Sequence, residues 1–136
     1  MLKYPCRPSK QINVEAAIMV EMCRKYVIPS VTKYLGILSE SISRQESIGL
    51  DTTEQRKVAT TLSSTLNKSI AATEDLHVSI AKALSYKEEV LKQAQLYRDE
   101  VSNQMLALRS HIDVMETHTD KSIWPFPSYD DLLFRL

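Results

Sequence analysis

The chain has 136 residues, of which 43% are hydrophobic and 25% charged, as expected for one soluble globular domain with its own core. Its 17 basic and 17 acidic residues balance, so no charge excess points to a nucleic acid or an anionic membrane as partner. Two cysteines, Cys6 and Cys23, are too few for a disulfide scaffold. No apolar run approaches the roughly 18 residues that cross a bilayer, and no signal-peptide pattern follows Met1. We therefore expect a cytoplasmic chain or a cytoplasmic piece of one.

Glycine and proline divide the chain into segments. Pro5 and Pro8 mark an irregular lead-in over residues 1–12, and Gly49 closes the segment that follows it. Neither residue type appears again until Pro125, and apolar residues recur every three or four positions within that long stretch. This periodicity indicates helices packed on partners and argues against disorder.

The first predicted helix begins after Asn13, a residue type that caps helix N-termini. Its apolar stripe continues past Pro29, which we expect to kink the helix without ending it, since proline removes a backbone hydrogen bond and crowds the preceding turn. The stripe consists of Val14, Ala17, Ile18, Met22, Tyr26, Val31, Leu35, Leu38 and Ile42.

Two further stripes predict a second and a third helix. The second helix can be capped by Asp51, Thr52 or Thr53. Its stripe consists of Val58, Leu62, Leu66, Ile70, Thr73, Leu76, Ile80 and Leu84, and the third stripe consists of Leu91, Ala94, Tyr97, Val101, Met105, Leu108, Ile112 and Met115.

A tight turn is expected between these two helices. Ser85 with Glu88 has the capping-box pattern, which places the turn near Ser85–Tyr86. Three stripes of similar length can then bury one another. We therefore expect an all-α fold, an antiparallel bundle of three long helices over residues 13–122.

The chain ends in an aromatic segment, with both phenylalanines and the single tryptophan in its last 13 residues. Large rings bury about 150–250 Å² each when they pack, and Pro125 and Pro127 hold the backbone extended. Ser128 with Asp131 repeats the capping pattern and predicts a short helix over residues 130–134. Residues 123–136 are thus expected to form a docking tail, received either by its own bundle or by another domain. Its expected contact residues are Trp124, Pro125, Phe126, Pro127, Tyr129, Leu132, Leu133 and Phe134.

No constellation of catalytic or metal-binding residues is visible. His111 and His118 stand seven residues apart, about 10.5 Å along a helix, which is too far for one zinc ion. Two glycines exclude a glycine-rich phosphate loop. Glu74 with His77 is the single Glu-x-x-His pair in the sequence, whereas a di-metal bundle site requires one on each of two helices. We expect no catalytic, cofactor-binding or metal-binding residue in this chain.

Three segments together carry a family resemblance. The first is Ile12-Asn13-Val14-Glu15-Ala16, continuing through Met19, Met22 and Ile28-Pro29 to Tyr34. The second is Arg98-Asp99-x-Val101, then Met105-x-Ala107-Leu108-Arg109 and Asp113, and the third is Trp124-Pro125-Phe126-Pro127-Ser128-Tyr129 with Asp131-Leu132-Leu133-Phe134. In this order they resemble the C-terminal region of type III glutamine synthetases, although that family often has a small residue where Asp130 stands.

The resemblance implies a non-catalytic C-terminal domain of an enzyme that joins ammonia to glutamate with ATP hydrolysis and magnesium. It also implies that the ATP, metal and glutamate sites lie in upstream domains. The implied partners are the catalytic domain of the same polypeptide and neighbouring subunits, possibly as a homo-oligomer, with no nucleic acid and no membrane. The alternative is a free-standing helical adaptor or coiled-coil interaction protein, supported by the near-heptad spacing from Leu91 to Met115 and by the initiator-like Met1.

Overall fold

The computed structural model describes residues 9–127, which form helices and contain no strand. The first rod consists of α1 (Ser9–Met22), the π-helical segment η1 (Cys23–Val27) and α2 (Ile28–Ser47). The second rod is α3 (Thr53–Leu84), and the third consists of α4 (Val90–Leu96), the π-helical segment η2 (Tyr97–Val101) and α5 (Ser102–His118). The all-α class and the three long helices predicted from the sequence are confirmed.

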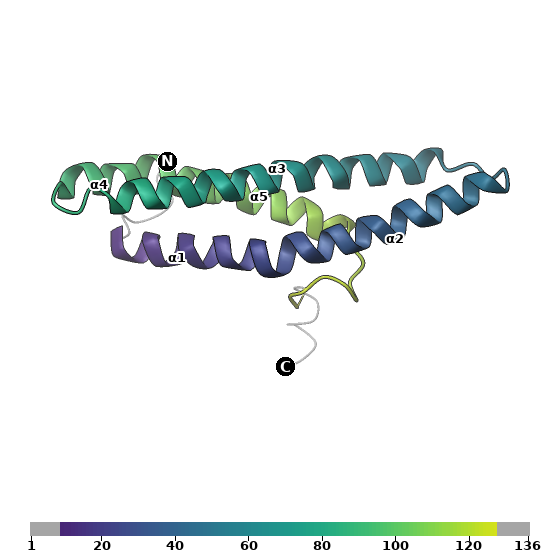
Figure 1. The fold of residues 1–136 in the computed structure, drawn as a ribbon, viewed down its shortest axis with the longest axis horizontal. Coiled ribbons are helices and arrows are strands. Elements are labelled where there is room, and N and C mark those ends of the chain that lie inside the picture. The colour runs from purple at the N-terminus through teal and green to yellow at the C-terminus, as the bar shows by residue number, and fades with distance from the viewer. Residues whose placement is uncertain (1–8, 128–136) are drawn as a thin grey trace.

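The second rod is the element that the other two rods share. α3 packs against α1, α2 and α5, and the chain reverses direction before and after it (Figure 1). The third rod ends near the middle of α3. Beyond that point the C-terminal part of α2 and the N-terminal part of α3 continue together as a two-helix arm.

The first rod differs from the sequence expectation at its start. α1 begins at Ser9, so Asn13 lies inside the helix and does not cap it. Ile12 is only 5% exposed, and its packing in the core explains why the helix extends to this earlier turn. The chain remains helical through Pro29, as expected. The predicted kink at that residue stays a prediction.

A π-helical turn immediately precedes Pro29. The N–H of Ile28 donates to the carbonyl of Cys23, five residues earlier, and so this turn holds one residue more than a turn of α-helix. The extra residue rotates the faces of α2 relative to those of α1. The predicted stripe therefore lies outside the core before the turn, where Val14 and Ile18 are exposed, and inside it afterwards, where Val31 and Ile42 are buried.

The core forms two clusters along α3. One lies between α1, α3 and the third rod, and consists of Ile12, Ala16, Val20, Cys23, Leu76, Ile80, Ala83, Tyr97, Val101, Met105 and Leu108. The other lies where the first rod enters α2, and consists of Val27, Val31, Leu62, Leu66, Met115 and Trp124. Two buried hydroxyls on α3 are satisfied within the helix, since Ser69 donates to the carbonyl of Thr65 at 2.8 Å and Thr73 to that of Ser69 at 2.7 Å.

The turn expected between the second and third helices is present, but its expected capping box is wrong. α3 ends at Leu84 and α4 begins at Val90. The hydroxyl of Ser85 donates backwards to the carbonyl of Lys82 at 2.6 Å, so it ends α3 and does not start α4. The residue that precedes α4 is Glu89, which makes no side-chain capping bond.

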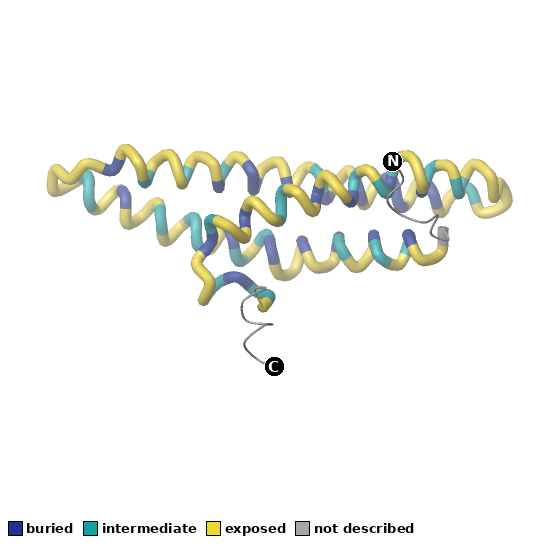
Figure 2. Tube along the Cα trace, turned by 180° about the vertical axis from the view of Figure 1, so that it is seen from behind, coloured by how far each residue is buried: buried dark blue, intermediate teal, exposed yellow. Residues whose placement is uncertain are grey.

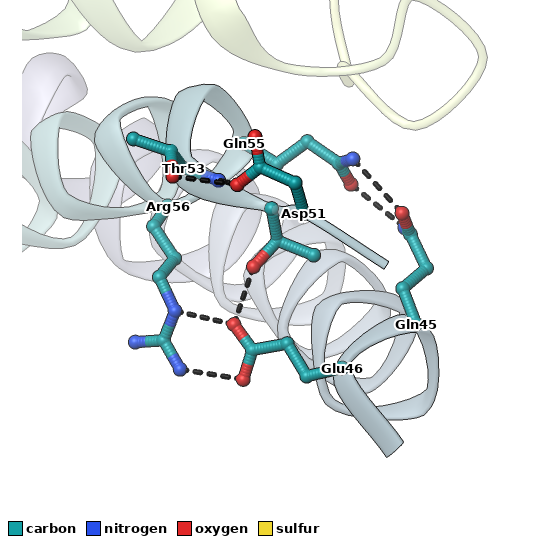
Figure 3. A network of polar contacts seen from close by, with 7 residues as sticks. Gln45, Glu46, Asp51, Thr53, Gln55 and Arg56 are labelled. Carbon is teal, nitrogen blue, oxygen red and sulfur yellow. Dashed lines mark hydrogen bonds and ion pairs between the residues drawn. The ribbon is translucent and has the colours of Figure 1, made fainter. Parts of the chain in front are cut away.

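Polar side chains clamp the tip of the arm, where α2 turns into α3 (Figure 3). The Glu46 carboxylate accepts hydrogen bonds from Nε and Nη2 of Arg56, the latter at 2.7 Å, and from the Thr52 hydroxyl. Gln45 and Gln55 exchange two amide hydrogen bonds of 2.7 and 2.9 Å. Both pairs join α2 to α3, so they fix the two helices relative to each other at the end that the third rod does not reach.

The turn itself depends on Gly49 and Asp51. Gly49 has a φ of +83°, in the left-handed region that side-chain-bearing residues rarely adopt. Of the three candidate caps for the second helix, Asp51 is the one that acts on its first residue: Oδ1 accepts from the Thr53 N–H at 3.0 Å and from its hydroxyl at 2.6 Å. These hydrogen bonds lower the pKa of Asp51 below its usual value.

Two Gly→Ala substitutions should have opposite effects on stability. Gly49→Ala should lower the free energy of unfolding by about 1–2 kcal/mol, because the new Cβ is disfavoured at a left-handed φ. Gly36→Ala, within α2 and with open space around its Cβ, should raise it by about 0.5–1 kcal/mol. Urea unfolding followed by circular dichroism measures both. Equal stability of the two variants would contradict this account of the turn.

The Glu46 clamp should make stability depend on pH. Hydrogen bonds from Arg56 and Thr52 to the charged carboxylate lower the pKa of Glu46 from 4.5 to about 2. The unfolded chain, with an ordinary pKa, therefore binds the proton first, and the clamp's contribution is full above pH 4.5 and lost as the pH falls to about 2.

Glu46→Gln removes this contribution, so its urea midpoint should lie below that of the parent at neutral pH, and the gap should close on acidification. Glu54→Gln is the control, because Glu54 makes an exposed i,i+3 ion pair with Lys57. A constant gap for Glu46→Gln at every pH would refute the linkage.

Candidate docking surface

A compact turn after α5 brings the tail back to the first rod. The Thr119 hydroxyl donates to the Met115 carbonyl at 2.6 Å and closes the helix, and its backbone is extended. The Asp120 carboxylate then accepts from the N–H and hydroxyl of Ser122 at 2.8 and 2.9 Å, which lowers the pKa of Asp120. The backbone N–H of Trp124 donates to the Asp120 carbonyl at 2.9 Å. The indole is thereby aimed at the bundle.

Trp124 belongs to the core of its own bundle. Its side chain is 9% exposed and packs in one cluster with Val27, Leu66 and Met115, one from each rod. Two surfaces could bind the tail, its own bundle or another domain, and Trp124 packs on its own bundle. A ring shared by three rods stabilises their mutual arrangement, since it buries apolar surface of all of them at once.

The next part of the tail lies against the outside of the first rod. The Phe126 ring is half-buried and meets the Tyr26 ring edge-on, with centroids 6.1 Å apart and planes at 61°. It also meets the Trp124 ring at 6.4 Å and 80°. Pro125 is half-buried and Pro127 is exposed. The remaining expected contact residues, Tyr129, Leu132, Leu133 and Phe134, and the predicted short helix over 130–134 lie outside the described residues.

The outer face of the first rod carries an exposed apolar row, here called the outer stripe, formed by Val14, Ile18, Met22 and Tyr26. Their exposed fractions are 52%, 53%, 38% and 52%. They recur every fourth residue, and Val14, Ile18 and Met22 each follow one of the buried residues Ile12, Ala16 and Val20 by two positions, which places them on the opposite side of the helix. Figure 2 shows the buried positions of this rod on the side that faces the other helices. The C-terminal end of the outer stripe is the Tyr26 ring that Phe126 contacts.

Sequence reasoning found the residues of the outer stripe but assigned them to the core. α1 carries apolar side chains on two faces, and the periodicity alone cannot decide which of them is buried. The face with Ile12, Ala16 and Val20 is buried against α3 and the third rod, which leaves the face with Val14 and Ile18 exposed.

The described residues contain no cluster of potential metal ligands. Across residues 9–127, no group of three or more His, Cys, Asp or Glu side chains is placed to hold a metal ion. The Cys23 thiol is buried, and burial raises its pKa, so it is a poor nucleophile. Within the same residues, no helix has the length and apolar character needed to span a membrane.

A hollow in the arm lies between α2 and α3 and is an open groove. Its charged members are Glu46, Arg56 and Lys68, of which the first two are already paired with each other. Most other lining residues are small or hydroxyl-bearing, such as Ser39, Ser43, Ala59, Thr60, Ser63 and Ser64. The groove therefore presents no enclosed, charged pocket for a small ligand.

Two comparisons relate the chain to known proteins. Residues 7–46 match the family model of the glutamine synthetase C-terminal domain. Over 130 residues the chain is 22% identical to the glutamine synthetase of Bacteroides fragilis (strain YCH46). The aligned region covers 91% of this chain and 18% of that relative. No solved structure matches the chain. Both matches confirm the resemblance to a glutamine synthetase C-terminal domain that the sequence motifs predicted.

Trp124→Ala should lower the free energy of unfolding by about 3–5 kcal/mol, because it leaves a cavity where the three rods meet. Phe126→Ala removes another ring of the same tail, but a half-buried one at the edge of the second core cluster, and should cost clearly less. Thermal and urea unfolding of both variants measure the difference. A loss for Trp124→Ala no larger than that for Phe126→Ala would show that the indole does not hold the rods together.

Proposed function

We propose, from the premise that this chain is similar to the C-terminal domain of glutamine synthetases, that it is the non-catalytic C-terminal domain of a type III enzyme of that kind. The observation that carries the proposal is the match of residues 7–46, which covers nearly the whole first rod. The chain spans 18% of the length of its Bacteroides relative, so a full-length parent would hold the catalytic machinery elsewhere.

In this proposal the parent performs the ATP-dependent ligation of ammonia to glutamate, and its ATP, magnesium and glutamate sites lie outside this chain. The chemistry of the described residues agrees with that division. The paired charges of the arm, Glu46 with Arg56, hold two helices together. A cytoplasmic location is also proposed, in keeping with the free thiol of Cys23.

We further propose that the tip of the arm contacts the catalytic part of the polypeptide or a neighbouring subunit. Two large apolar side chains are exposed there, Ile48 at 75% and Leu50 at 51%, and Ile37, in the middle of α2, is exposed at 49%. The clamp of Glu46 and Arg56 holds the adjoining helices in place, so little order has to be gained when a partner binds. Apolar side chains on a pre-ordered, protruding tip are typical of a contact between protein parts.

The alternative function, a free-standing adaptor that binds a partner helix, has less support. It rests on the near-heptad spacing from Leu91 to Met115, which could form a coiled-coil seam. In the structure the middle and end of that row, including Tyr97, Leu108 and Met115, are buried against the chain's own helices. The row is therefore already occupied over most of its length.

The purified chain should release no phosphate from ATP above background in the presence of glutamate, ammonia and magnesium. The Bacteroides glutamine synthetase, assayed alongside, is the positive control, and the mass in solution of the same sample shows whether the chain self-associates. Activity from a folded helical sample would overturn the assignment as a non-catalytic domain.

Co-purification with the upstream part of the parent polypeptide tests the contact made by the arm. We expect the unsubstituted chain to co-elute with that upstream part. Ile48→Asp should weaken the complex without unfolding the domain, since Ile48 is 75% exposed. Val78→Asp, at an exposed position on α3, is the matched control. A gene without any upstream coding sequence would favour the adaptor.

A further inference from the structure

We propose that the arm pairs with the arm of a second copy of this chain, so that two α2 helices lie antiparallel across a two-fold axis. The contact surface, here called the arm face, lines one shallow hollow on the C-terminal half of α2 and consists of Ile37, Glu40, Ser41, Arg44, Gln45 and Ile48. The inference deepens the contact proposed above for the arm, and rests on it, by naming a second copy of the chain as the neighbouring subunit.

The arm face has a large apolar side chain at each end. Ile37 is 49% exposed and Ile48 is 75% exposed, and Ser41 between them is small. The two isoleucines are 11 residues apart in the sequence, about three turns or 16 Å of helix. The groove on the other side of the arm is lined mainly by small and hydroxyl-bearing residues. The arm is therefore apolar on one side, which is typical of a contact with another protein surface.

The polar members of the arm face have partners within their own chain. Arg44 pairs with Glu40 at 2.5 Å. The Gln45 amide donates to the Ser41 hydroxyl at 3.1 Å and exchanges two hydrogen bonds with Gln55. A protein surface that covers the arm face therefore buries neither an unpaired charge nor an unsatisfied amide, and the cost of removing water stays low.

The order of residues makes the arm face complementary to itself. Positions 37, 40, 41, 44, 45 and 48 have the same spacing when read in either direction. An antiparallel second copy related by a two-fold axis therefore places its Ile48 opposite Ile37, and its Ile37 opposite Ile48, so apolar ends meet apolar ends.

The charges of the arm face select the same arrangement. In the antiparallel pair, Arg44 of each copy approaches Glu40 of the other, and the two ion pairs join into a group of four alternating charges. In a parallel pair, Glu40 would oppose Glu40 and Arg44 would oppose Arg44, and like charges repel. The intramolecular pair stays intact in the antiparallel arrangement.

On α3 the arm lacks the helix that covers the rest of that helix. The third rod lies along one row of α3, where Ser79 donates to Glu100 at 3.3 Å and Ser69 donates to the Met115 sulfur at 3.6 Å. The row continues into the arm at steps of three or four residues and ends at Val58. Val58 is 38% exposed, because the third rod stops near the middle of α3 (Figure 1).

The exposed end of this row borders the arm face. Gln55 bonds to Gln45 of the arm face, and Val58 follows Gln55 by three residues, on the same side of α3. A second copy that covers Ile37 and Ile48 thus also reaches Val58. Two arms joined in this way form an antiparallel four-helix bundle, in which each helix buries its apolar side against the others.

Sedimentation equilibrium of the purified 136-residue chain tests the proposal. The mass should shift from monomer to dimer as the concentration rises. Ile37→Asp places a charge in the contact and should raise the dissociation constant of the dimer about tenfold or more. Val78→Asp is the control, because Val78 is similarly exposed, at 55%, but lies on α3 outside the arm. Circular dichroism confirms that both variants are folded.

A charge exchange tests the antiparallel arrangement. Arg44→Glu and Glu40→Arg should each weaken the dimer, and an equimolar mixture of the two variants should recover it, because the surfaces then have opposite charges. Lys25→Glu and Glu21→Arg, at an exposed i,i+4 ion pair of the first rod, are the controls and should leave the dimer unchanged, singly and mixed.

A chain that stays monomeric at every concentration would overturn the proposal, and so would a dimer that Ile37→Asp does not weaken. A mixture of the charge variants that fails to associate would exclude the antiparallel pair. A monomeric chain that still co-elutes with the upstream part of the parent polypeptide would refute the second copy as partner and leave the proposed contact of the arm standing.

Discussion

The burial of α3 against both other rods is the contact on which the rest of the structure depends. One face of α3 places Leu62 and Leu66 in one cluster, and Leu76, Ile80 and Ala83 in the other. Hydroxyl-bearing residues between them, such as Ser69 and Thr73, satisfy their own hydrogen bonds within the helix. They are small, and the two clusters lie one after the other along the rod on either side of them.

The π-helical turns decide which faces of the other rods meet α3. The extra residue in η1 rotates α2 relative to α1, and a second π turn, in which the Ser102 N–H donates to the Tyr97 carbonyl, lies in the third rod. Tyr97 and Val101 in that segment are both buried. As a result α1 keeps an apolar row outside the core, and this row ends where the tail returns.

The tail links this outer face to the core. Its indole is shared by the three rods, and its next ring rests on Tyr26, so the tail is held against the first rod. The opposite end of the molecule, at the arm, depends on polar contacts, because the third rod does not extend that far. A domain built in this way has an ordered apolar tip at one place and an aromatic tail at another.

The sequence by itself determined the helices, the breaks between them and the family resemblance. Uninterrupted apolar periodicity allows only helix, Gly49 supplies the left-handed residue of the first turn, and the aromatic motif marks the tail. Only the tertiary structure decided which face of α1 is buried, where the caps lie and what receives Trp124. α1 is apolar on two sides, and a π turn is invisible in residue spacing. The Ser85 hydroxyl can bond forwards or backwards equally well, so its role is settled by the path of the chain around it.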